Sequence, residues 1–161
     1  MSIRFRFGEL AGVACKYLYP IPVSSFTGSG DLIAICTLSS IGLLKRISKD
    51  KIMEKVVIAG RLFSENKGID SLVTFCTQSL TLKYLLICGR DTKGHYSGDA
   101  LVNLMANGID KENRIINAKA PYPYLSCSPL LVQNFRDKID LIDMRDCYDL
   151  DEIRNKINRI T

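Results

Sequence analysis

The chain has 161 residues, enough for one compact domain with a buried core and too few for two ordinary domains. Its formal charge is +5, from 22 basic and 17 acidic side chains, and the Lys and Arg residues are scattered rather than gathered into a stripe. This distribution argues against a nucleic-acid-binding protein and suits an anionic ligand or an acidic protein surface.

The six cysteines and the apolar segments indicate the compartment. No two cysteines form a CxxC pair, and Cys36 and Cys88 lie inside apolar runs, where a free thiol behaves as a small hydrophobe. We therefore expect reduced thiols and no zinc site. The N-terminal stretch is interrupted at Gly8 and Glu9, before it reaches signal-peptide length, and no window approaches the roughly 20 apolar residues of a membrane helix. The sequence predicts a cytoplasmic protein with no membrane span and no nucleic-acid partner.

The N-terminal part of the chain is expected to be irregular, and the first clear elements follow it. Residues 1–31 lack periodicity, and the stretch 24–30 is predicted to be a loop. Three apolar runs come next, at residues 32–38, 56–59 and 84–88. They are continuous rather than alternating, which is typical of strands buried on both faces of a parallel sheet.

Helical patterns over residues 66–77 and 98–105 follow the second and third of these runs. Strand, loop and helix in repetition predict βαβ units. The expected fold class is therefore α/β, a Rossmann-like three-layer sandwich with a mostly parallel sheet. Asn107-Gly108 predicts the end of the second helix.

The C-terminal half predicts two further strands and two further helices. Residues 114–116 form a short strand candidate, and the prolines in the loop 120–125 exclude a helix there. A helix over 129–138 opens with Pro and leads to a strand candidate at 139–142. Asp149 or Asp151 then caps a charged terminal helix reaching residue 160.

The ligand is expected at one edge of this sheet, because open parallel sheets bind ligands beyond the carboxyl ends of their strands. The candidates for ligand contact come from the loops at that edge: Thr37, Leu38, Ser39, Ser40, Gly60, Arg61, Glu65, Asn66, Gly89, Arg90, Gly94, Gly98 and Pro121. Several of these residues can instead have a structural role in their own loop. The two serines suit a turn, Asn66 suits a helix cap, and the two arginines suit either a phosphate or solvent.

His95, the only histidine, lies in the loop after the third apolar run, between Gly94 and Gly98. Imidazole is a common ligand for transition metals, but a lone histidine is more often a structural or surface residue. Zinc would need three or four protein ligands. A corrinoid supplies four equatorial nitrogens itself and needs only one axial donor from the protein, so a single histidine suffices.

Several blocks, read in order, resemble one family: AICTLSS at 34–40, AGRLFSENKGID at 59–70, LLICGRDTKGHYSGDAL at 85–101, NGID at 107–110, IINAKAPYPYL at 115–125 and FRDKIDLIDM at 135–144. The sequence looks like the A subunit, the corrinoid-bearing one, of the tetrahydromethanopterin S-methyltransferase complex of methanogenic archaea. The resemblance implies a single cobalamin-binding domain over residues 1–161, with an irregular segment at 1–31, the resembling region at 32–144 and a terminal helix at 145–161.

The resemblance also implies a cofactor and a role. His95 would be the lower axial cobalt ligand of cobalamin, as 5-hydroxybenzimidazolylcobamide or a related corrinoid. The chain would carry a methyl group from methyl-tetrahydromethanopterin to coenzyme M and would need partner methyltransferase proteins. No separate catalytic residue is expected, because the cofactor makes the bonds. Members of the membrane complex continue into a C-terminal membrane helix, whereas this sequence ends at Thr161, so it looks like a cytoplasmic relative.

A ligand imidazole needs its second nitrogen held by a carboxylate, carbonyl or hydroxyl. The nearest candidates in sequence are Asp91, Thr92, Ser97 and Asp99. Two other functions stay open. One is a flavodoxin-like module that binds a flavin or nucleotide at the same edge, although no phosphate-loop pattern is present. The other is a regulatory homologue that has lost the cofactor.

Overall fold

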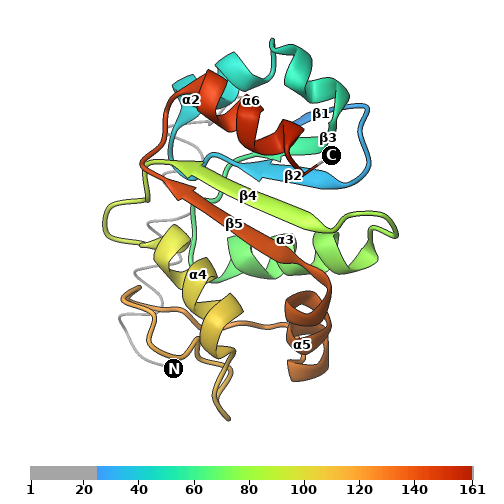
Figure 1. The fold of residues 1–161 in the computed structure, drawn as a ribbon. Coiled ribbons are helices and arrows are strands. Elements are labelled where there is room, and N and C mark those ends of the chain that lie inside the picture. The colour runs from blue at the N-terminus through green and yellow to red at the C-terminus, as the bar shows by residue number, and fades with distance from the viewer. Residues whose placement is uncertain (1–24, 161) are drawn as a thin grey trace.

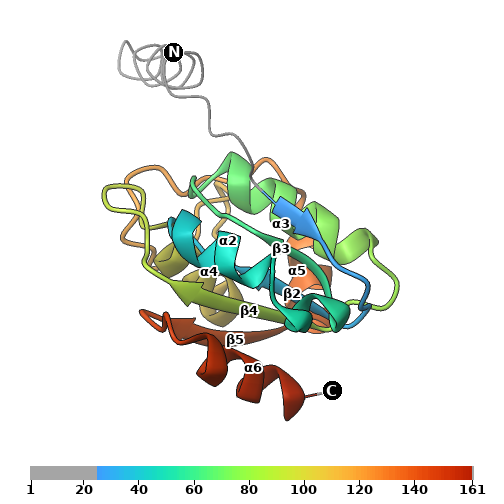
Figure 2. The ribbon, with the colours of Figure 1, turned by 90° about the horizontal axis from the view of Figure 1, so that it is seen from above.

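The computed structural model describes residues 25–160, which fold around one five-stranded sheet (Figures 1 and 2). The strands follow the order β1-β3-β2-β4-β5 across the sheet. Strands β2 to β5 run parallel, and β1 lies antiparallel on the outer edge of β3. Their bounds are β1 Ser25–Thr27, β2 Ile33–Cys36, β3 Val56–Gly60, β4 Tyr84–Gly89 and β5 Asp140–Arg145.

Helices cover both faces of the sheet. They are α2 Ile41–Ile47, the 3₁₀ helix η1 Lys51–Glu54, α3 Lys67–Gln78, α4 Ser97–Asn107, α5 Pro129–Lys138 and α6 Leu150–Asn158. Figure 1 shows α2 and α6 on one face and α3, α4 and α5 on the other. Each face has its own buried core, one closed by α3 to α5 and the other by α2 and α6. The predicted α/β three-layer sandwich is therefore confirmed.

The apolar runs form the centre of the sheet as predicted. Every residue of β2 is buried, and β4 is buried from Leu85 to its end. In register, Cys36 of β2 lies beside Gly60 of β3 and Ile87 of β4. The carboxyl ends of these three strands therefore meet at one edge, and the loops after them lie close together.

Three expectations about secondary structure were wrong or incomplete. The stretch 24–30 contains β1 rather than only a loop, because Gly28 and Gly30 donate to Val57 O and Val56 O and keep the chain against β3. Residues 114–116 make isolated bridges and no strand. The seven-residue helix α2 has no counterpart in the sequence pattern.

Other boundaries agree closely with the sequence. Helix α5 spans the predicted residues, with Ser128 accepting from Leu131 N at its start. Gly108 ends α4 with a φ of 73°, as the Asn-Gly pair predicts. Asp149, rather than Asp151, caps α6, which ends at Asn158 instead of residue 160.

The remaining expectations concern absences. Within residues 25–160, no helix combines the length and the apolar character needed to cross a membrane. The five cysteines of this part of the chain are free thiols. The expectation that the N-terminal stretch is no signal peptide falls on residues outside the described ones.

Candidate functional site

His95 and Glu65 meet at the carboxyl edge of the sheet, on the side of α3 and α4. His95 lies in the β4–α4 loop, and its Nδ1 is 2.8 Å from Oε2 of Glu65 in the β3–α3 loop. The Glu65 side chain is 4% exposed and the imidazole is 47% exposed. Because Nδ1 is turned toward the buried carboxylate, Nε2 lies on the other side of the ring. The pair can therefore offer one nitrogen to a ligand while the other is held.

The second oxygen of Glu65 makes a hydrogen bond to a different loop. Oε1 accepts the backbone N–H of Tyr122 at 3.3 Å, in the proline-bearing loop after α4. This loop has two further attachments of the same kind. Lys119 N donates to Asp99 at 2.9 Å, and Cys127 N donates to Asp70 at 3.0 Å. The predicted Pro121 loop is thus brought to the His95 side of the edge.

Asp91 organises the loop that carries His95. Its Oδ1 accepts the N–H groups of Thr92 and Gly98 at 2.7 Å each, and its Oδ2 accepts Asp99 N at 2.8 Å. Two of these donors belong to the first turn of α4, where backbone N–H groups lack helical partners. Tyr96, at the start of this helix, has a φ of 48° and makes no side-chain cap. Asp91, which lies five residues before Tyr96, therefore supplies the missing cap of α4.

None of the four residues predicted to hold the second nitrogen of His95 does so. Asp91 binds backbone N–H groups, and the hydroxyls of Thr92 and Ser97 bond to each other at 3.0 Å and to Leu62 O. Asp99 binds the N–H of Lys119. The partner is Glu65, which lies 30 residues earlier in the chain and is expected from the sequence only to touch the ligand. The prediction relied on closeness in sequence to His95. The sequence alone does not show how near the β3–α3 loop lies to the β4–α4 loop.

Arg61 and Phe63 extend the site beside His95. The Phe63 ring centroid is 5.7 Å from that of His95, and the Arg61 guanidinium stands 5.5 Å from the Phe63 centroid. Burial lowers the pKa of Arg61. Its Nε is buried without a hydrogen-bond partner in the part of the chain described. Phe63 is not among the predicted contacts; its only sequence signal is its position in a loop already expected at this edge.

Several predicted contact residues serve the backbone. Thr37 is buried and donates its N–H to Gly60 O at 2.8 Å. Leu38 is fully buried with a φ of 51°. The Asn66 side chain caps α3 by accepting Lys67 N at 2.6 Å, so its local role is confirmed.

Ser39, Ser40 and Arg90 form a second group, on the side of α2 and α6. Ser39 Oγ donates to Arg90 O at 2.7 Å, and Arg90 N donates to Ser40 Oγ at 2.8 Å. Gly89, with a φ of 72°, makes this close approach possible, because a Cβ there would lie 2.6 Å from Ser40 Oγ. The structure therefore divides the predicted site into two regions that flank β2 and β4.

A zinc-type site needs three or four protein ligands around the metal ion. Among residues 25–160, no group of three or more His, Cys, Asp or Glu side chains is placed to hold one.

Comparison with known proteins matches the chain to one family model and to several relatives. The family model for the A subunit of tetrahydromethanopterin S-methyltransferase matches residues 26–161. One relative, from Methanothermobacter marburgensis, is named as the second form of this A subunit. It is 33% identical over 127 residues, which are 78% of this chain and 66% of the relative.

Two further relatives carry the name of the same A subunit. The protein of Methanosphaera stadtmanae is 29% identical over 120 residues, 73% of this chain and 48% of its own. That of Methanohalophilus mahii is 32% identical over 104 residues, 64% of this chain and 43% of its own. In these two relatives the matched region thus covers less than half of the protein.

Proposed function

Because the chain belongs to the family of tetrahydromethanopterin S-methyltransferase A subunits, we propose that it carries a corrinoid whose cobalt is ligated by His95. The cofactor would be cobalamin, as 5-hydroxybenzimidazolylcobamide or a related corrinoid. The proposed role is the transfer of a methyl group from methyl-tetrahydromethanopterin to coenzyme M, together with partner methyltransferase proteins. The observation that carries the proposal is the bond between Nδ1 of a half-exposed His95 and the buried Glu65.

The residues of the site fit a corrinoid. The macrocycle needs one protein nitrogen, and Nε2 of His95 is turned away from Glu65. Apolar surface for a large ring comes from three aromatic side chains that are 44–48% exposed, namely Phe63, Tyr96 and Tyr122. The guanidinium of Arg61, which stands over the Phe63 ring, would donate N–H groups to the amide and phosphate oxygens of such a cofactor.

Glu65 would set the chemical state of the imidazole. A carboxylate at Nδ1 keeps the proton on that nitrogen, orients the ring and makes Nε2 a better donor. Tyr122 N and the burial of Glu65 would hold the carboxylate in place. When bound, the corrinoid would supply the cobalt–carbon chemistry of methyl transfer, and the protein would supply binding and orientation.

The other residues would shape the site rather than react. Gly94 lies beside His95 with a φ of 84°, and a Cβ there would meet nothing within 4 Å, which leaves room for a bulky cofactor. Gly98 lets Asp91 and Leu38 pack under the loop, because a Cβ there would lie 2.9 Å from Leu38 Cδ1. Cytoplasmic location and the identity of the partner proteins stay predictions.

The test is a visible absorption titration of the purified chain with cobalamin. We expect stoichiometric binding with a spectral shift that reports the axial imidazole, and we expect His95→Ala to lose the shift. His95→Gln serves as a matched variant of similar size without the imidazole. Absence of cobalamin binding by the wild-type chain would contradict the proposal and would favour a homologue that has lost the cofactor.

A further inference from the structure

A hollow of about 490 Å³ lies on the opposite side of the sheet edge from His95. It is lined by Ser39, Ser40, Gly42, Leu43, Arg46, Arg90 and Tyr148. Leu43 belongs to the core closed by α2 and α6, whereas Glu65 and His95 precede the helices α3 and α4 of the other layer. The hollow is therefore distinct from the imidazole site.

Its position is one where sheets of this kind bind ligands. The chain passes from β2 to β3 on one side and then to β4 on the other, so β2 and β4 are neighbours whose loops diverge. A place where the loops of two neighbouring parallel strands leave in opposite directions is a topological switch point. It opens a crevice beyond the carboxyl ends of the two strands. Ser39 and Ser40 follow β2, and Arg90 follows β4.

The polar groups around the hollow are mostly donors. Arg46 donates through Nη1 to Tyr148 O at 3.2 Å, which holds its guanidinium across the hollow and leaves further N–H groups. Arg90 has its backbone clamped by the two serines. Since Ser40 Oγ accepts from Arg90 N, its own proton remains to be donated.

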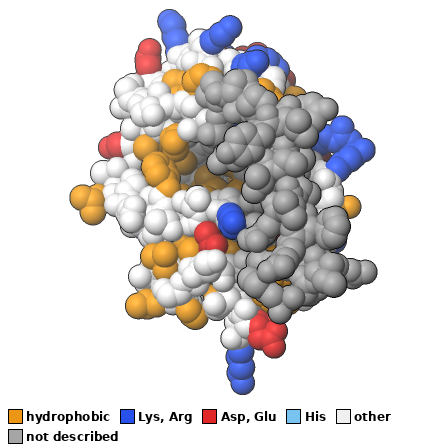
Figure 3. Space-filling model, turned by 180° about the vertical axis from the view of Figure 1, so that it is seen from behind, with side chains coloured by type: hydrophobic (Ala, Val, Ile, Leu, Met, Phe, Trp, Pro, Cys, Tyr) orange, Lys and Arg blue, Asp and Glu red, His pale blue; other side chains and the backbone are white. Residues whose placement is uncertain are grey.

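Among residues 25–160, no acidic side chain lines the hollow, although Asp146 lies close by, with its backbone N–H bonded to Gly89 O. Asp149 accepts the N–H of Asp151 to cap α6, and Asp143 pairs with Arg145 at 2.7 Å. Both basic and acidic side chains stand at the end of the molecule formed by α2 and α6 (Figure 3). The guanidinium groups of Arg46 and Arg90 match the planar, bidentate demands of phosphate oxygens.

We propose that this hollow binds a phosphate group through Arg46, Arg90 and Ser40. The phosphate has two chemical sources: the phosphodiester in the nucleotide tail of a corrinoid, which rests on the proposed function, or a separate phosphorylated molecule. Arg90 and His95 are five residues apart on one loop, hence within about 18 Å of each other. One large cofactor or two separate ligands can occupy the two regions.

The first experiment uses inorganic phosphate and the full-length chain. Backbone amide NMR at constant ionic strength should show shifts at Ser40 and Arg90, and calorimetry should give the affinity. The double variant Arg46→Gln/Arg90→Gln removes two charged hydrogen-bonding groups and should weaken binding at least about tenfold. Gly42→Leu should block the hollow without strain, because a Cβ at this position meets no atom within 4 Å.

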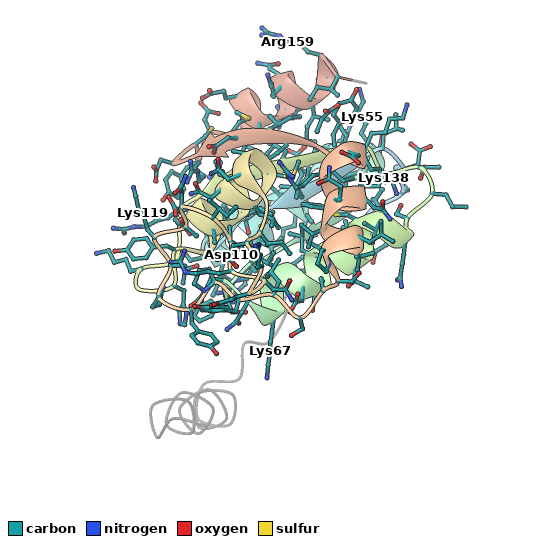
Figure 4. The ribbon with its side chains drawn as sticks, turned by 90° about the horizontal axis from the view of Figure 1, so that it is seen from below. Lys55, Lys67, Asp110, Lys119, Lys138 and Arg159 are labelled. Atoms are coloured by element: carbon teal, nitrogen blue, oxygen red, sulfur yellow. The ribbon has the colours of Figure 1, made fainter. Side chains whose placement is uncertain are left out.

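A charge-matched control separates a site from general attraction. Lys67→Gln/Lys119→Gln removes the same charge from the α3 and α4 side, where both lysines point outward (Figure 4). We expect this control to bind phosphate as the wild type does. Equal weakening in both double variants, or no shift at Ser40 and Arg90, would overturn the proposal.

The second experiment distinguishes the two sources by comparing cobalamin with cobinamide, which lacks the nucleotide tail. If the tail phosphate occupies the hollow, cobalamin binds at least about tenfold more tightly, and the arginine double variant loses that preference. If the ligand is a separate molecule, both corrinoids bind equally and inorganic phosphate still binds the loaded protein. Failure of both corrinoids to bind, with phosphate binding intact, would overturn the proposed function and leave the phosphate site standing.

Discussion

The two helical layers use their acidic side chains in different ways. On the side of α3 and α4, Glu65, Asp91 and Asp70 accept N–H groups from loop backbone, and Glu65 also holds His95. On the side of α2 and α6, Asp50 and Asp149 accept N–H groups at the starts of their own helices, and Asp50 and Asp151 pair with the guanidinium of Arg154. Carboxylates that bind backbone fix the position of a loop, whereas surface ion pairs contribute little. The geometry around His95 therefore depends on a few acids that are not interchangeable.

The largest effect on stability is expected at Asp91. Asp91→Ala should lower the free energy of unfolding by about 2–3 kcal/mol, because two N–H groups at the start of α4 and the N–H of Thr92 lose their acceptor. Urea unfolding followed by far-ultraviolet circular dichroism measures this. Asp143→Ala, which breaks a partly exposed ion pair, is the control. Equal losses in the two variants would mean that a carboxylate that binds backbone contributes no more than a partly exposed ion pair.

The next effect concerns Glu65 and rests on the proposed function. Glu65→Ala should weaken cobalamin binding about 10- to 100-fold, because the Nδ1 partner of a ligand histidine is lost. Glu65→Gln keeps an acceptor oxygen for Tyr122 N and should lose less. Absorption titration gives both affinities, and thermal unfolding of the apoproteins shows whether the variants remain folded. Unchanged affinity in Glu65→Ala would exclude Glu65 as a positioning residue.

A smaller and pH-dependent effect is expected on the other layer. The hydrogen bond from Arg154 holds the pKa of Asp50 below its usual value. A lowered folded-state pKa adds stability above the unfolded value, near 3.9, and that stability is lost as the pH falls through the folded value. Arg154→Gln should therefore be less stable than wild type at pH 7, by less than Asp91→Ala, and the difference should shrink below about pH 4. A difference that grows on acidification would contradict this assignment.

The smallest effect is expected for the pair of Asp143 and Arg145 on β5. Both side chains are partly exposed, and their N–O distance is 2.7 Å. Arg145→Gln should change the free energy of unfolding by no more than about 0.5 kcal/mol at moderate salt. Urea unfolding at two salt concentrations measures it. A loss above about 1 kcal/mol would mean that the edge strand depends on this pair.

Local signals explain which elements the sequence predicts well. Ser128-Pro129 sets the start of α5, and Gly108 ends α4, because caps depend on residues close in sequence. β1 has three residues and α2 has seven, too few to show a period. The bridges at residues 114–116 depend on contacts with residues 109 and 124, which no local pattern gives.

The same holds for the site: local sequence signals identify one member of the His95–Glu65 pair but not the other. His95 stands out as the only histidine, and the strand pattern places its loop at the correct edge. Its bond to Glu65 joins two loops 30 residues apart, and the candidates near in sequence were wrong. The sequence nevertheless allows Glu65 to be predicted as the partner of His95. The two loops are expected at one edge, and Glu65 is the only acid in the segment 60–66.

The segment from Thr37 to Ser40 links the two halves of the edge. Leu38, with a positive φ, packs against Gly98 below the His95 loop, while Ser39 and Ser40 clamp Arg90 beside the hollow. These four consecutive residues therefore contact both regions. Natural variation in this lineage should then be correlated: a larger residue at position 98 requires a smaller one at 38, and a side chain at position 89 requires a smaller residue than serine at 40. We therefore expect the residues of the two surfaces to change together.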